Sequence, residues 1–257
     1  MDNQYLKNIK NGMKVAVLTT SQHKYSTGII EEIAARNPFH EQGIMVRLTN
    51  GDIGRVQKIF LTEDQQKDKY FTAIKKVLEK GENFHTEFKS EAFWSITFNP
   101  IQIKETKSFE LREYGQRASK VIIAKSIAAF LNSEGGNLLI GVKENKEKGN
   151  FEIVGIEEDI KKSRDHNLDG YKRTLIDEII RTFFPPKIYN HFHNYIEIEF
   201  VDIEEKIVCW IKVKRSDSRV FLKINDRDVF MIRVDSENRT LEGEKLVDYC
   251  IKKWGAR

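Results

Sequence analysis

SKVIIAKSIAAFLNSEGGNLLIGV, residues 119–142, is the most informative stretch of this sequence. Its first half predicts a buried helix, because apolar residues recur at the spacing of one helix face. These residues are Val121, Ala124, Ala128 and Leu131, with Ile123, Ile127 and Phe130 widening the stripe. Gly135 and Gly136 supply the positive φ that closes a helix, and Leu138–Val142 is then typical of a central strand. Such apolar elements need partners, so the flanking chain is expected to fold onto them.

Composition indicates a soluble globular protein. The 257 residues are 40% apolar and 32% charged, and this length allows one large domain or two smaller ones. No apolar run reaches the roughly 18 residues of a membrane span, and the N-terminus has no apolar signal region. Cys209 and Cys250 lie in apolar patterns and are expected to be buried hydrophobes rather than a disulfide or a metal site. We therefore expect a cytoplasmic protein without a membrane partner.

Residues 1–63 are expected to form a small β-barrel-like domain. Four short β-prone segments follow one another: Met13–Leu18, Thr27–Ile33, Gly43–Leu48 and Asp52–Phe60. Asn50-Gly51 predicts a hairpin turn, since both residues tolerate the positive φ of a type I′ turn. Residues 64–81 read as a helical connector that ends at Gly81.

The first segment resembles the YwbE-like small domain. The resemblance is carried by Asn11–Val15, Thr27–Ile30, His40–Leu48, Gly51 and Gly54–Val56. It implies no activity. Arg47, Arg55 and Lys58 are either nucleic-acid contacts, as on other small barrels, or ordinary surface charge.

Residues 82–257 are expected to form a second, mixed domain, so the fold class is α+β. Residues 91–116 are interpreted as a loop or hairpin insertion, with a strand-like alternation from Trp94. The other predicted strands are Thr86–Lys89, Phe151–Ile156, Tyr195–Val201, Lys206–Lys214 and Val229–Val234, and the predicted helices are Leu168–Phe184 and Thr240–Trp254.

Three acidic residues are candidate metal ligands. Glu82 and Glu87 flank the start of the first strand, and Glu144 follows the central one. Carboxylates that converge at a strand edge suit Mg²⁺ or Mn²⁺, and such an ion can activate water for attack on a phosphodiester. Lys89 shares a strand face with Glu87 and is a candidate phosphate contact. From spacing alone, three ordinary surface glutamates explain the pattern better.

A second resemblance changes this balance. Residues 82–241 resemble the Schlafen AlbA-like domain. The matching segments are Glu82-x4-Glu87-Phe88-Lys89, Ile127–Val142, Ile153–Ile156, Phe230–Val234 and Asn238–Thr240. The resemblance implies a nucleic-acid-binding fold, and in some members a metal-dependent endoribonuclease acting on structured RNA such as tRNA. Its three-carboxylate site maps onto Glu82, Glu87 and Glu144, although the third acid is usually aspartate.

One run of basic residues, six between Lys212 and Arg227, stands out from the rest of the chain. The residues expected to hold a nucleic-acid backbone are Lys212, Lys214, Arg215, Arg219, Lys223 and Arg233. For Arg233 a salt bridge is nearly as good an interpretation. His191 and His193 alternate as zinc ligands on a strand can, but a surface loop is the better interpretation.

The sequence thus supports two main hypotheses. The first is a Mg²⁺- or Mn²⁺-dependent endoribonuclease that acts in phage defence or as a toxin, with RNA favoured over DNA and a homodimer as one way to build a cleft. The second is a non-catalytic DNA- or RNA-binding regulatory module, and a protein-interaction scaffold is a weaker third. The resemblance also implies that nuclease activity varies among members.

Overall fold

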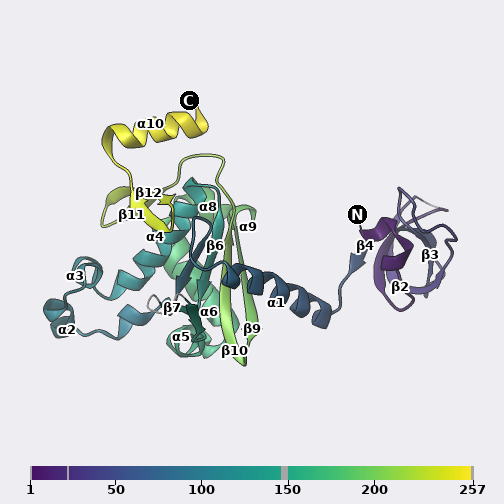
Figure 1. Cartoon of the computed structure of the whole chain (residues 1–257), viewed down its shortest axis with the longest axis horizontal. Coiled ribbons are helices and arrows are strands. Elements are labelled where there is room, and N and C mark those ends of the chain that lie inside the picture. The colour runs from purple at the N-terminus through teal and green to yellow at the C-terminus, as the bar shows by residue number, and fades with distance from the viewer. Residues whose placement is uncertain (1, 22, 146–149, 256–257) are drawn as a thin grey trace. The chain divides into compact units, whose positions relative to one another are not determined.

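The computed structural model describes residues 2–21, 23–145 and 150–255 (Figure 1). The chain divides into two compact units, Met1–Tyr70 and Phe71–Arg257, and helix α1 (Glu63–Glu79) crosses the division. Ile74 and Leu78 on its second half are buried, as the predicted apolar stripe requires. No helix in the described part of the chain is long and apolar enough to span a membrane.

The first unit is a closed antiparallel barrel, which confirms the predicted fold of this region. Its strands are β1 (Lys14–Thr19), β2 (Tyr25–Ile33), β3 (Met45–Leu48) and β4 (Ile53–Phe60). Val15, Val17, Val46 and Val56 fill the interior with neighbouring aliphatic residues. A turn forms at Asn50-Gly51, but only Gly51 has positive φ there, so it is not a type I′ turn.

The second unit is built around a four-stranded mixed sheet in the order β5-β6-β10-β9. β5 pairs parallel with β6, and the other neighbours are antiparallel. The strands are β5 (Thr86–Lys89), β6 (Gly136–Ile140), β9 (Ile196–Ile203) and β10 (Lys206–Val213). Helix α4 (Ala118–Asn132) shares its core with this sheet and buries residues all round, so the predicted central helix and strand are confirmed.

Two smaller sheets complete the strands. β7 (Val142–Asn145) pairs antiparallel with β8 (Asn150–Ile153). Gly141, with positive φ, separates β7 from β6. β11 (Phe221–Ile224), β12 (Arg227–Val234) and β13 (Glu237–Thr240) form a three-stranded sheet, of which only β12 was predicted. C-terminal helix α10 (Gly243–Trp254) contributes Cys250 to a cluster with Phe230 and Ile232 of β12.

The remaining helices are short. Residues 94–117 form a series of short helices, so the strand-like interpretation of this segment was wrong. Asn99 and Ser108 cap α2 (Pro100–Glu105) and α3 (Phe109–Tyr114). The predicted helix 168–184 forms with a π-helical turn at Ile176–Ile180. The other helices are α5 (Glu157–Lys162), α6 (Leu168–Leu175), α7 (Arg181–Phe183), α8 (Pro186–Asn190) and α9 (Phe192–Tyr195).

Candidate functional site

The predicted acidic residues lie around β5. Glu82 precedes the strand, and its Oε1 accepts a hydrogen bond from the Phe88 backbone N–H at 2.7 Å, so the turn between them is closed by the carboxylate. Glu87 and Lys89 share one face of β5, and Lys89 Nζ is paired with Glu87 Oε1. Glu144 is half-buried on β7.

The carboxyl of Glu82 lies within electrostatic range of Glu87 and Glu144. Burial is the main cause that raises its pKa, and the hydrogen bond from Phe88 opposes this effect. The negative charges of Glu87 and Glu144 raise it further, while Lys89 lowers it. A carboxyl group with a raised pKa beside two other acids and a lysine is a feature found at functional sites.

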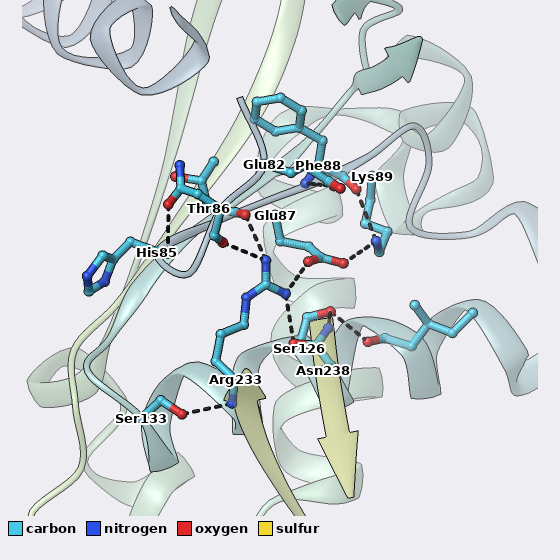
Figure 2. A network of polar contacts seen from close by, with 12 residues as sticks. Glu82, His85, Thr86, Glu87, Phe88, Lys89, Ser126, Ser133, Arg233 and Asn238 are labelled. Atoms are coloured by element: carbon cyan, nitrogen blue, oxygen red, sulfur yellow. Dashed lines mark hydrogen bonds and ion pairs between the residues drawn. The ribbon is translucent and has the colours of Figure 1, made fainter. Parts of the chain in front are cut away.

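Arg233 is the centre of the network in Figure 2. Its guanidinium is paired with Glu87 Oε2, and it also donates to the backbone oxygens of Asn83 and Thr86 at 2.8 Å each and to Asn238 Oδ1 at 3.0 Å. The side chain has no exposed surface, and its guanidinium lies 5.2 Å from the centre of the Phe130 ring. Arg233 therefore ties β12 to β5.

This burial corrects the prediction that Arg233 contacts phosphate. A phosphate contact needs an accessible guanidinium, whereas this one is enclosed by a carboxylate, two carbonyls and an aromatic ring. The alternative interpretation, a salt bridge, describes its geometry.

The same network bears on the predicted metal site. Both oxygens of Glu87 are engaged by cations, one by Lys89 and the other by Arg233. Among the described residues, no group of three or more His, Cys, Asp and Glu side chains is arranged to hold a metal ion. In this conformation the carboxylates do not fit Mg²⁺ or Mn²⁺, because Glu87 is already charge-compensated. His193 lies on α9, not on a strand.

Polar residues at and just after the end of α4 hydrogen-bond to β12 and to the segment before β11. These contacts were not predicted from the sequence. The Asn132 amide donates to the backbone oxygens of Val220 and Met231 at 2.8 and 3.0 Å and accepts from Val220 N. Ser133 Oγ accepts from Arg233 N at 2.8 Å. Polar residues at the end of an otherwise apolar helix were the available signal, because a buried amide must find partners.

The other predicted nucleic-acid contacts differ in exposure. Lys212 is partly buried, pairs with Glu197 at 3.1 Å and lies 4.4 Å from the centre of the Trp210 ring. The remaining four are exposed on the segment that joins β10 to β11 and on β11 itself: Lys214, Arg215, Arg219 and Lys223. Arg215 pairs with Glu134 at 3.4 Å, and Lys223 with Asp228 at 3.6 Å.

The second unit matches a known protein family. The family model described as "Schlafen, AlbA_2" matches residues 82–242, which is more than half of the chain. The chain belongs to the Schlafen AlbA_2 family. The matched region includes β5, α4, β12 and the whole Glu87–Arg233 network.

The barrel has its own relatives. Residues 2–59 match a family described as an uncharacterized conserved protein family, DUF2196. The segment is 34% identical over 65 residues to "Uncharacterized protein YwbE" of Bacillus subtilis, which is 24% of this chain and the full length of that protein. The predicted YwbE-like resemblance is confirmed.

Two solved structures resemble the chain more distantly. The DIP2311 protein of Corynebacterium diphtheriae is 14% identical over 68% of this chain, with a TM-score of 0.39, and the chain spans only 30% of it. The N-terminal domain of a "Putative ATP-dependent DNA Helicase RecG-related Protein" from Nitrosomonas europaea is 16% identical, with a TM-score of 0.37. That match covers 67% of this chain and 94% of the domain.

Proposed function

We propose that this Schlafen AlbA_2 protein binds nucleic acid through a basic loop, defined as residues 214–223 with Lys214, Arg215, Arg219 and Lys223. Family membership supports nucleic-acid binding. The observation that carries the proposal is that the backbone of the loop is hydrogen-bonded to α4 and α10 while its four cations are exposed. Exposed cations in a fixed arrangement suit a phosphate backbone, because little ordering is required when phosphates bind.

The anchoring of the basic loop comes from the end of α4 and from α10. Ser216 N donates to the Leu131 backbone oxygen at 2.8 Å, and Val220 N donates to Asn132 Oδ1 at 2.9 Å. Trp254 Nε1 donates to the Ser216 backbone oxygen at 3.4 Å. Lys214 is exposed and has no ion pair with any residue that the structure describes.

Binding is measured by the anisotropy of labelled tRNA, single-stranded DNA and duplex DNA in about 50 to 200 mM salt. We expect Lys214→Ala to weaken binding and to reduce the slope of log K against log salt by about 0.7 to 0.9. Lys161→Ala, an exposed lysine on α5 paired with Glu158, is the matched control and should leave binding unchanged. Equal effects of the two changes would contradict the proposal, and the three probes decide between RNA and DNA.

A metal-dependent endoribonuclease is the second candidate, including the toxin or defence role. The raised pKa of Glu82 beside Glu87 and Glu144 favours it, whereas the engagement of Glu87 by Arg233 and Lys89 opposes it. Purified protein is incubated with labelled tRNA in Mg²⁺, Mn²⁺ or EDTA. Metal-dependent cleavage that Glu82→Gln and Glu144→Gln both abolish supports the nuclease. Binding without cleavage in Mg²⁺, Mn²⁺ and EDTA alike supports the regulatory module. Light scattering of the complex tests separately for a homodimer.

A further inference from the structure

The outer surface of the barrel carries a second set of residues suited to nucleic acid. Side chains alternate between the interior and the exterior along each strand, so the strand pairing fixes which residues share the outside. Across β2, β1 and β4 the paired outer residues form three rows: Ile29–Lys14–Phe60, Thr27–Ala16–Lys58 and Tyr25–Leu18–Arg55. We call these nine residues the β2–β1–β4 face.

The β2–β1–β4 face combines cations with exposed flat or apolar side chains. Tyr25 is 74% exposed and Ile29 47% exposed. Phe60 is half-buried, with Lys58 Nζ 5.1 Å from the centre of its ring. An aromatic ring beside an ammonium group can stack on a base while the cation contacts the neighbouring phosphate.

The charge of this face has one sign. Lys14, Lys58 and Arg55 are its ionisable cations, and none of the nine positions is acidic. Lys14 and Lys58 have no ion pair with any residue in the described ranges, and the Arg55 guanidinium donates to the Gly43 backbone oxygen at 3.1 Å. Two acidic side chains of the barrel have partners elsewhere, since Glu32 is paired with Arg47 of β3 and Asp52 accepts a hydrogen bond from Ser26, while Glu31 is exposed on β2 just beyond the nine positions.

The geometry favours an extended single strand over a duplex. Tyr25 and Phe60 occupy opposite corners of the face, two strands and four residues apart, which is a separation of roughly 15 to 20 Å. At that distance the two rings contact different bases of the same strand. A base is available for stacking on a protein ring only where it is not already stacked inside a duplex.

We infer that the β2–β1–β4 face binds single-stranded nucleic acid, with Tyr25 and Phe60 as stacking residues and Lys14 and Lys58 as phosphate contacts. This site is separate from the basic loop of the second unit and does not depend on it. The ligand chemistry, a flexible sugar–phosphate chain with accessible bases, is shared by RNA and DNA.

The experiment uses the full chain and labelled single strands of about 12 nucleotides, oligo-U and oligo-dT, with a duplex of the same length as comparison. We expect Tyr25→Ala to weaken single-strand binding on the order of tenfold and Tyr25→Phe to retain it, because phenylalanine keeps the stacking surface. Lys58→Ala should reduce the salt slope by about 0.7. Arg36→Ala, an exposed cation on the segment that follows β2 and outside the face, is the matched control.

Three results would overturn the inference. These are the absence of single-strand binding by the full chain at about 50 mM salt, unchanged affinity in Tyr25→Ala, and an equal loss in Arg36→Ala. Loss of tRNA binding in Lys214→Ala, with oligonucleotide binding intact, would leave the inference standing. This result therefore distinguishes a failure of the basic-loop proposal from a failure of the β2–β1–β4 face.

Discussion

The pair between Glu87 and Arg233 is the residue-scale feature with the largest expected energetic effect. Both side chains are almost fully buried, and Arg233 Nε has no hydrogen-bond partner in the described structure. Removing one member leaves an uncompensated charge in the interior, which typically costs about 3–5 kcal/mol. A cleavage assay on Glu87→Ala would confuse lost catalysis with lost folding, so Glu82 and Glu144 are the better positions to change.

The first prediction is that Glu87→Ala lowers the free energy of unfolding of the second unit by about 3–5 kcal/mol in urea denaturation. The double variant Glu87→Met with Arg233→Met should be less destabilised than Glu87→Ala, because no buried charge remains unpaired. Glu237→Ala breaks an exposed pair with Arg239 and should change stability by less than about 1 kcal/mol. A loss for Glu87→Ala as small as this control would show that the buried pair does not hold β12 to β5.

The second prediction concerns pH. Because the pKa of Glu82 is raised in the folded protein, its ionised form is disfavoured by folding. That unfavourable effect is present above the raised pKa and absent below the ordinary value of 4.5. Glu82→Gln, which keeps an oxygen for the Phe88 N–H, should therefore raise the melting temperature relative to the native protein at pH 7 to 8.

The same difference in melting temperature should shrink as the pH falls toward about 4. Scanning calorimetry of both proteins across this range measures it. A difference that stays constant with pH would mean that folding does not raise the pKa of Glu82.

At the scale of elements, the turn from α4 to β6 depends on two glycines for different reasons. Gly135 has φ +76°, and a Cβ there would lie 2.6 Å from the Val213 backbone oxygen. Gly136 does not have positive φ, contrary to expectation, but a Cβ on it would meet the Phe130 ring at 2.4 Å. The double glycine therefore ends the helix and also lets β6 approach its neighbours.

The third prediction compares two glycines of similar conformation. Gly135→Ala should destabilise the protein by about 3 kcal/mol or more, from positive φ and a backbone clash together. Gly243→Ala, at φ +58° with nothing within 4 Å of its Cβ, should cost only about 1 kcal/mol. Urea denaturation of both variants measures the difference, and equal losses would show that the close approach at Gly135 has no energetic weight.

Sequence reasoning located the elements whose patterns are local. The stripe of α4, the hairpin of β9 and β10 and the inward residues of α10 follow from spacing, and each is present. The helices within 94–117 were missed, because their capping residues Asn99 and Ser108 outweigh an alternating apolar pattern. Strands β11 and β13 were missed because each has only four residues, and β13 is mostly exposed and has no apolar side chain.

The sequence suggested which acidic residues to expect at the site, but it could not predict their hydrogen bonds and ion pairs. The charges of Glu87 and Glu144 both raise the pKa of Glu82, after the larger effect of its burial, so Glu82 lies within electrostatic range of each. That Arg233 would engage Glu87 could not be read from the sequence, because 146 positions separate the two residues.

For the whole molecule, two compact units with two independent cationic surfaces predict additive binding. Lys58 lies in the first unit and Lys214 in the second. The fourth prediction is that Lys58→Ala and Lys214→Ala each lower the salt slope for a long single-stranded RNA by about 0.7, and that the double variant lowers it by about 1.4. A double variant no worse than either single change would indicate one shared contact instead of two.

The long reach of Arg233 also bears on biosynthesis. During translation, β5 leaves the ribosome long before β12. The Glu87 carboxylate and the backbone oxygens of Asn83 and Thr86 therefore have no arginine partner until Arg233 is made, 146 residues after Glu87. A nascent or prematurely terminated polypeptide lacking residue 233 holds the acidic residues without their arginine. The charge balance around Glu87 is therefore reached only after synthesis has passed residue 233.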